Sequence, residues 1–347
     1  MIKASFFPYQ LEFKKPSGTS RGILTHKKIW IVKIWNEENP EIFGIGECNP
    51  LVGLSIDDRN DFEDKLKNIC EHINDFINAE LYEFPSIRFA IETAYKDLQN
   101  GGKRILFDNA FSRGEKGIVI NGLVWMGSKQ EMFEQIEDKI KRGFKCIKLK
   151  IGAIDFKIEL SLIKSIRDQY SEKDIEIRVD ANGAFSTNEA LQKLEKLSHY
   201  KLHSIEQPIQ QGQTEAMHDL CKKTPLPIAL DEELIIHQQH KAKEKLLDEI
   251  NPQYIILKPS LLGGWKACEE WIEAAEKLNI GWWITSALES NIGLNAIAQW
   301  TAGFNTTTSQ GLGTGALYTN NFISPLQTEG QILTYNRNEH STIGYWT

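Results

Sequence analysis

The spacing of apolar and polar positions along the chain changes near residue 110. Residues 1 to about 55 alternate between apolar and polar side chains, as in "IWIVKIW" (29–35) and "IFGIGE" (42–47), with "NEENPE" between them. This alternation and its turn residues predict an antiparallel meander. From about 56 to 101 the apolar spacing becomes helical, and Pro85 and Gly101 are placed to begin and end a helix. We therefore expect an α+β unit of roughly 110 residues first.

Beyond this unit, apolar runs of strand length alternate with longer amphipathic segments. The order predicts repeated βα units around a parallel sheet, and the number of runs favours a TIM-type barrel. A doubly wound open sheet has the same strand pattern and stays open as an alternative. The runs are "IVINGLVW" (118–125), "CIKLKIG" (146–152), "IEIRVDANG" (175–183), "LHSIEQP" (202–208), "PIALDEE" (227–233), "YIILKP" (254–259) and "GWWITSALE" (281–289).

Composition narrows the kind of partner. The chain has 347 residues, is 41% hydrophobic and has a formal net charge of −7. A net negative charge argues against nucleic-acid or anionic-membrane surfaces, so small molecules are the expected partners. The five cysteines are widely spaced without a C-x-x-C pair, and no run is long enough to span a bilayer. We expect a cytoplasmic protein, and the sequence leaves its oligomeric state open.

Polar residues recur where the predicted barrel strands end. They follow one another at intervals of roughly 25 to 30 residues, which is one βα unit each. Because the carboxyl ends of barrel strands meet at one mouth, these side chains are expected to converge on one site. The strand-end residues are Lys150, Asp180, Glu206, Asp231, Lys258 and Thr285.

A lysine pair stands out within one apolar run. Lys148 and Lys150 are two apart in a predicted strand, so both ammonium groups project from the same face. Two unit charges about 4 Å apart interact by roughly 4 kcal/mol at an effective dielectric of about 20, which is enough to shift a pKa substantially. We expect lysines grouped in this way to have pKa values lowered toward neutrality, where they can act as bases.

The three carboxylates suggest a metal. Asp180, Glu206 and Asp231 offer only hard oxygen ligands, which suit Mg²⁺ better than Zn²⁺. A single acidic residue at a strand end is more often a helix N-cap or a surface group. A whole set in register is much harder to explain by capping, so we expect one divalent ion, Mg²⁺ with Mn²⁺ as a substitute.

The flanking motifs "KLK", "VDANG", "IEQP", "LDE" and "LKPS" resemble those of the enolase superfamily, in its muconate-cycloisomerase-like branch. The resemblance covers the whole chain. It implies a (β/α)7β barrel over residues 113–319 and an α+β capping domain over 1–112 together with 320–347. It also implies magnesium ligation by Asp180, Glu206 and Asp231, with Lys150 as the acid/base.

The resemblance assigns supporting roles as well. Lys258 becomes the lysine that faces the base, and Lys148 lies close enough to lower the pKa of Lys150. Asn182 in "DANG" and Glu232 in "DEE" are expected to support the site. These roles are carried over from the family and do not follow from spacing alone.

Within the branch, the late-barrel segments "WITSALESNIGLNAIAQW" (283–300) and "GLGTGALYTNNF" (311–322) resemble those of dehydrating synthases. The shared chemical step is removal of a proton alpha to a carboxylate, and here loss of hydroxide follows. The expected substrate is 2-succinyl-6-hydroxy-2,4-cyclohexadiene-1-carboxylate, and the expected product is 2-succinylbenzoate of menaquinone biosynthesis. A racemase or epimerase of N-acylamino acids or dipeptides, and a non-catalytic protein that retains the fold, stay open as alternatives.

The substrate contacts are the least determined part. Where dipeptide epimerases carry an acidic pair to hold an ammonium group, this chain offers Thr285 and Ser286, whose hydroxyls suit a succinyl carboxylate or carbonyl. Glu289 is the nearby carboxylate, and its direction does not follow from the sequence. The Gly-rich loops of the cap are expected to close over the barrel, with Arg21 as a candidate partner of a substrate carboxylate. The remaining candidates in this group are Gly311 and Gly313.

Overall fold

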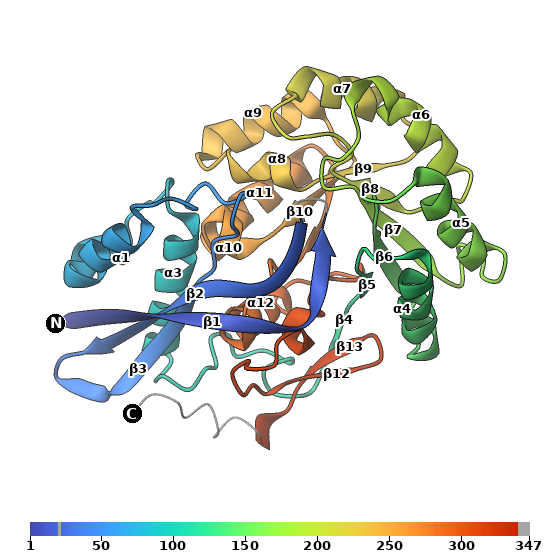
Figure 1. Ribbon diagram of the computed structural model, residues 1–347. Coiled ribbons are helices and arrows are strands. Elements are labelled where there is room, and N and C mark those ends of the chain that lie inside the picture. Colours follow the sequence, from blue (N-terminus) through green and yellow to red (C-terminus); the bar gives the residue numbers. More distant parts are fainter. Residues whose placement is uncertain (20–21, 339–347) are drawn as a thin grey trace.

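The protein consists of two parts, which lie side by side in Figure 1. One is an antiparallel sheet with its helices, and the other is a barrel of parallel strands. The structure is a computed structural model, and it describes residues 1–19 and 22–338. Across these two ranges no helix combines the length and the apolar character needed to cross a membrane.

The antiparallel sheet and its helices form the cap. Its strands run in the order β1 (Ile2–Thr19), β2 (Gly22–Asn36) and β3 (Asn39–Cys48), which confirms the predicted meander. The helices are α1 (Phe62–Glu71), α2 (Ile73–Phe76) and α3 (Pro85–Gln99). Pro85 begins α3 as predicted, and the chain leaves the helix through Gly101, whose φ is +83°.

Helix α3 lies directly against β3 because two glycines allow it. A Cβ atom on Gly44 would come 1.8 Å from the carbonyl oxygen of Ala94, and one on Gly46 would come 2.0 Å from that of Ala90. Any side chain at either position would therefore push the helix away from the sheet. Buried apolar side chains of β2, α1 and α3 fill the remaining space, among them Val32 and Leu66.

The second part of the chain forms a parallel sheet of seven strands in the order β11-β10-β9-β8-β7-β6-β5. The strands are β5 (Gly122–Val124), β6 (Cys146–Lys150), β7 (Glu176–Asp180), β8 (Ser204–Glu206), β9 (Ile228–Leu230), β10 (Tyr254–Leu257) and β11 (Gly281–Ile284). One long helix follows each strand. These helices are α4 (Lys129–Lys141), α5 (Phe156–Arg167), α6 (Thr187–Ser198), α7 (Thr214–Lys223), α9 (His240–Ile250), α11 (Trp265–Lys277) and α12 (Asn291–Thr301). Short helices also occur at α8 (Glu232–Ile235), α10 (Pro259–Leu262) and η1 (Thr314–Ala316).

The segment after α12 closes the ring between the two edge strands. Gln310 pairs in parallel with Ile120, and Gly311 pairs in parallel with Thr285. The amide of Gly311 donates to the carbonyl of Ile284 at 2.8 Å, while the amide of Asn121 donates to Gln310 at 3.0 Å. An eighth strand position therefore joins both edges, which confirms the (β/α)7β barrel and excludes the doubly wound alternative.

The expected continuous strand over 118–125 is wrong in detail. It is divided into β4 (Ile118–Val119) and β5, because β4 leaves the barrel to pair with a hairpin near the chain's end. That hairpin consists of β12 (Leu326–Glu329) and β13 (Ile332–Tyr335), in the sheet order β12-β13-β4. The backbone of the first barrel strand thus serves two sheets in succession.

The chain returns to the cap just before this hairpin. Tyr318 forms a bridge with Phe13 of β1, and their ring centroids are 4.8 Å apart. The amide of Lys14 donates to the carbonyl of Leu317 at 2.8 Å. The domain limits of 1–112 with 320–347 for the cap and 113–319 for the barrel stay a prediction, and residues 339–347 lie outside the described chain.

Candidate active site

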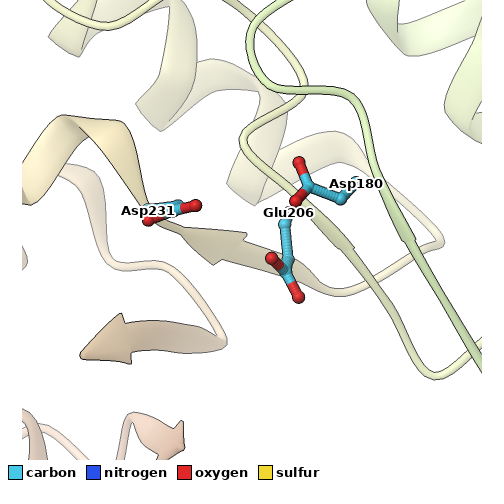
Figure 2. A group of neighbouring side chains, drawn as sticks. All are labelled: Asp180, Glu206 and Asp231. Atoms are coloured by element: carbon cyan, nitrogen blue, oxygen red, sulfur yellow. The ribbon is translucent and has the colours of Figure 1, made fainter. Parts of the chain in front are cut away.

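Three carboxylates converge at the mouth of the barrel. Asp180 ends β7, Glu206 ends β8, and Asp231 directly follows β9. One ligand oxygen from each lies within 4.8 Å of the others, and all three side chains are buried (Figure 2). Although Asp231 occupies the N-cap position of α8, its side chain makes no capping hydrogen bond there. Capping therefore does not account for this residue, and the three form a candidate metal site.

Three lysines surround these carboxylates. Nζ of Lys150 lies 2.6 Å from Oδ2 of Asp180, and Nζ of Lys148 lies 2.9 Å from the same oxygen. Lys148 also donates to Glu206. On the other side, Nζ of Lys258 lies 2.5 Å from Oδ2 of Asp231. We call the set the mouth cluster; its members are Lys148, Lys150, Asp180, Glu206, Asp231 and Lys258.

The strand order places the two outer lysines on opposite sides of the acids. Lys150 is on β6 and Lys258 follows β10, and between these strands lie β7, β8 and β9, which carry the three carboxylates. A substrate bound above the acids would thus have an ammonium or amine group at each flank. The geometry suits either one lysine acting as a base with the other as a cation, or a base on each face.

The lysines differ in their electrostatic environment. Burial and the charges of Lys148 and Lys258 lower the pKa of Lys150, against the opposing effect of Asp180. For Lys148 and Lys258, nearby carboxylates outweigh burial and raise the pKa. The expectation that the grouped lysines all have lowered pKa values is therefore wrong for these two, because each faces more negative than positive charge. Burial also raises the pKa of Glu206 to about 7.

Asn182 is a second hydrogen-bond partner of Lys150 beside Asp180. Its Oδ1 accepts from Nζ of Lys150 at 2.8 Å, and its Nδ2 donates to Oε1 of Glu232 at 2.9 Å. The φ of Asn182 is +45°, a left-handed conformation that asparagine tolerates better than most residues. The structure thus places Asn182 against Lys150 and links it to Glu232 by a hydrogen bond, while their supporting roles stay a prediction.

A cavity of about 270 Å³ opens above the mouth cluster. Its wall includes Lys148, Lys150, Lys258 and Asn182, together with the predicted Thr285, Ser286, Gly311 and Gly313. Sequence reasoning missed several other lining residues, which are Leu24, Leu51, Val52, Leu54, Asn121, Leu123, Trp125 and Thr314. Asn121 and Trp125 lie in or beside the first barrel strand, whose lack of charged residues gave no signal. The cap contributes apolar side chains to the same wall.

The sequence leaves open the side-chain directions of two candidate site residues, Glu289 and Arg21. Glu289 is fully buried, and its carboxylate accepts from the hydroxyl of Ser286 at 2.5 Å and from the amide of Ala287 at 2.7 Å. These hydrogen bonds therefore stabilise the part of the cavity wall that Ser286 and Ala287 form. Arg21, expected to face a substrate carboxylate, lies outside the described residues.

Comparison with known proteins defines the class. Residues 131–335 match the family model described as enolase C-terminal domain-like, so the chain belongs to the enolase superfamily. The o-succinylbenzoate synthase of Desulfotalea psychrophila is 46% identical over 96% of this chain and 98% of that protein. Within the superfamily, the chain belongs to the o-succinylbenzoate synthase family.

Solved structures agree with this placement. The crystal structure of MenC from Desulfotalea psychrophila has a TM-score of 0.85 and 42% identity, covering 96% of this chain and 99% of that one. The dipeptide epimerase of Enterococcus faecalis, complexed with Mg and the dipeptide L-Leu-L-Tyr, has a TM-score of 0.78 and covers 96% of this chain and 97% of its own. Its identity of 20% supports a common fold alone.

Proposed function

We propose that the protein is a Mg²⁺-dependent o-succinylbenzoate synthase, which dehydrates 2-succinyl-6-hydroxy-2,4-cyclohexadiene-1-carboxylate to 2-succinylbenzoate in menaquinone biosynthesis. The observation that carries the proposal is the placement of Lys150 and Lys258 on opposite flanks of three convergent carboxylates, facing one cavity. The similarity to the Desulfotalea synthase supports the choice of substrate. A cytoplasmic location belongs to the same proposal, and the five free cysteines are consistent with a reducing compartment.

The side chains present fit a magnesium ion. Oε1 of Glu206 is buried and has no hydrogen-bond partner within residues 1–19 and 22–338, so its lone pairs are available to a ligand. Asp180, Glu206 and Asp231 would hold the ion, since hard carboxylate oxygens are its preferred protein ligands. When bound, the ion would stabilise the negative charge that develops on the substrate carboxylate as the alpha proton leaves.

Lys150 is assigned the proton transfers. Its contacts with Asp180 and Asn182 orient the amine. Its lowered pKa favours the neutral form, which can accept the ring proton alpha to the carboxylate. The electrons of the broken C–H bond then expel the 6-hydroxyl group, and the Lys150 ammonium returns the proton to it. One water leaves and the ring becomes aromatic. Both transfers use one lysine, so hydrogen and hydroxyl leave from the same face.

Lys258 is assigned an electrostatic role. Carboxylates raise its pKa, which keeps it cationic at neutral pH. From its flank of the cavity the fixed charge would stabilise the electron-rich ring during elimination. Lys148 lies deeper, between Asp180 and Glu206, and would maintain the lowered pKa of Lys150.

A proton-transfer reaction without elimination is the second candidate, because lysines at both flanks would also serve a racemase or epimerase. The L-Ala-D/L-Glu epimerase of Francisella tularensis subsp. novicida is 28% identical over 61% of this chain. Here the wall of the cavity offers the hydroxyls of Thr285 and Ser286, and no carboxylate is among its lining residues as described. An ammonium-bearing substrate therefore lacks an obvious counter-charge in this wall.

The test is the ultraviolet progress curve of the purified protein with Mg²⁺ and the cyclohexadiene substrate. Rapid conversion of the diene to the aromatic product, abolished by a chelator and restored by Mg²⁺, is the expected result. Folded, metal-loaded protein that leaves the diene unchanged would reject the proposal. Exchange of an alpha proton of N-acylamino acids or dipeptides with deuterated solvent would then identify the second candidate, whereas failure to bind Mg²⁺ at all would favour a non-catalytic protein.

A further inference from the structure

Another buried lysine lies between the cap and the barrel. Lys27 of β2 is 7% exposed, and its Nζ donates to the backbone carbonyl oxygens of Ala287 at 2.9 Å and of Leu288 at 2.8 Å. It also donates to Oδ1 of Asn49 in the cap. These contacts use all three donors of the ammonium group. A cap residue thus binds the backbone of the barrel loop that joins β11 to α12.

This loop is part of the substrate cavity and contains a strained residue. Thr285, Ser286, Ala287 and Leu288 all line the cavity. The φ of Leu288 is +64°, a left-handed conformation that is strained for a leucine and persists only where surrounding contacts enforce it. The two carbonyls bound by Lys27 belong to Leu288 and the residue before it, so the lysine acts on the strained backbone itself.

The same loop is joined to the segment that carries the facing lysine. Glu289 accepts hydrogen bonds from Ser286 and from Ser260, which lies two residues after Lys258. Nδ2 of Asn49 donates to Ser260 at 3.3 Å and to the carbonyl of Ala287 at 2.9 Å. Contacts from the cap therefore reach both the cavity wall and the start of α10.

Two further groups complete this arrangement. Glu47 of β3 accepts from the amide and the hydroxyl of Ser290 at 2.9 and 2.5 Å. The hydroxyl of Tyr318 donates to the carbonyl of Leu288 at 2.8 Å. We call the polar set the interface cluster; its members are Lys27, Glu47, Asn49, Ser260, Glu289 and Ser290.

We infer that Lys27 is a positioning residue of the substrate pocket: from the cap, it holds the Thr285–Ser290 loop in the strained conformation that shapes the pocket wall. The cap thereby determines pocket geometry through a residue that is absent from the cavity lining. This inference deepens the proposed function, and its kinetic test rests on that function. Its structural test does not.

The structural test is hydrogen–deuterium exchange of the metal-free protein. Lys27→Met keeps the side-chain length but removes all three donors, and it should speed amide exchange in residues 285–290 by about ten-fold or more. Lys28→Met is the matched control, because Lys28 is the next residue of β2 and forms an exposed pair with Glu63. Unchanged exchange of the loop in folded Lys27→Met protein would overturn the inference.

The kinetic test separates positioning from general stability. Lys27→Met should raise KM for the cyclohexadiene substrate by about ten-fold, with a smaller change in kcat, since the mouth cluster lies on other strands. In a protein that already carries Leu288→Gly, Lys27→Met should raise KM much less than it does in the wild type. Glycine adopts a positive φ without strain, so the loop no longer needs Lys27 to hold it. A KM equal to that of the wild type in Lys27→Met, or no rescue by glycine, would contradict the inference.

A folding defect would not leave the question open. If Lys27→Met does not fold, Lys27→Arg keeps the charge but changes the direction of the donors, and it should increase both loop exchange and KM by about three-fold. Wild-type values for this variant would overturn the inference. If the wild-type protein lacks synthase activity while Lys27→Met still speeds exchange of the loop, the proposed function is rejected and the role of Lys27 is retained.

Discussion

The mouth cluster and the interface cluster both combine lysine with carboxylate side chains, yet they differ in which groups remain available to bind a ligand. Each buries a lysine together with carboxylates, Lys148 in the mouth cluster and Lys27 in the interface cluster. In the interface cluster, both oxygens of Glu289 and of Glu47 accept hydrogen bonds, and Lys27 uses its three donors. In the mouth cluster, Oε1 of Glu206 has no hydrogen-bond partner in the described chain.

The difference shows which buried charges are poised for chemistry. The mouth cluster adjoins a cavity of about 270 Å³ and has three acids with ligand oxygens close together. The interface cluster is saturated by hydroxyls and backbone groups, which fixes its geometry and leaves little capacity for a ligand. Burial and perturbed pKa values occur in both, so they identify an active site only together with an unsatisfied group and an adjoining cavity.

The largest expected effect comes from removing the proposed base. Lys150→Ala should lower kcat by about a thousand-fold or more, because the other amine of β6, Lys148, is held by Asp180 and Glu206 and its pKa is raised. Steady-state kinetics measure the loss, and calorimetric titration should show that Mg²⁺ still binds. Turnover close to that of the wild type would remove Lys150 from the mechanism.

Loss of one proposed ligand should come next. Glu206→Gln keeps the shape of the side chain but removes a negative charge, so affinity for Mg²⁺ should fall by about a hundred-fold. Calorimetry measures the affinity, and activity should recover partly at high Mg²⁺ concentration. Glu189→Gln on the exposed face of α6 is the control and should bind Mg²⁺ normally. Unaltered affinity in Glu206→Gln would contradict the assigned metal site.

The interface cluster should instead affect stability with pH. Burial raises the pKa of Glu47 from 4.5 to about 7, so the folded state binds its proton more tightly than the unfolded state. The contribution of this group to the free energy of unfolding is therefore present at low pH and declines as pH rises from 4.5 to 7. Relative to Glu47→Gln, the wild type should lose about 2 to 3 kcal/mol across that window.

Denaturant titrations of both proteins at several pH values measure this difference. They are best done without metal, so that the mouth cluster contributes equally to the two proteins. A difference between wild type and Glu47→Gln that stays constant from pH 4.5 to 7 would show that Glu47 has an ordinary pKa.

The smallest expected effect concerns the cavity wall. A Cβ atom at position 311 would lie 2.5 Å from Oγ1 of Thr285, whereas one at position 313 would lie 3.7 Å from the carbonyl oxygen of Asn121, an ordinary van der Waals contact. Gly311→Ala must therefore displace Thr285 and should reduce kcat/KM about ten-fold, and Gly313→Ala should have the smaller effect. Steady-state kinetics of the two variants decide this, and equal effects would show that the contact with Thr285 is unimportant.

The mouth cluster can be predicted from the sequence because its strand-end residues recur at intervals of one βα unit. Asp180, Glu206 and Asp231 end successive strands, so parallel closure brings them together regardless of loop detail. The same argument places Lys150 and Lys258 at the two flanks. The hydrophobic periodicity of the chain also predicts the meander of the cap and the strands of the barrel.

The interface cluster has no such periodic signal. Lys27 and Ala287 are far apart in the chain, and their contact depends on how the cap docks on the barrel. Strand alternation places Lys27 and Lys28 on opposite faces of β2, but it does not indicate which of the two lysines the barrel covers. The direction of Glu289 follows from Ser260 and Ser286 together, which only the folded loops bring into contact. The raised pKa of Lys258 was likewise hidden, because it depends on distances to several carboxylates.

The most direct test of the contrast between the clusters is a crystal structure of the protein with Mg²⁺ and 2-succinylbenzoate. We predict one ion ligated by Asp180, Glu206 and Asp231, with the aromatic ring between Lys150 and Lys258 and the interface cluster unchanged. An ion bound in the interface cluster, or a ring bound away from the two lysines, would contradict the assignment of the mouth cluster as the catalytic centre.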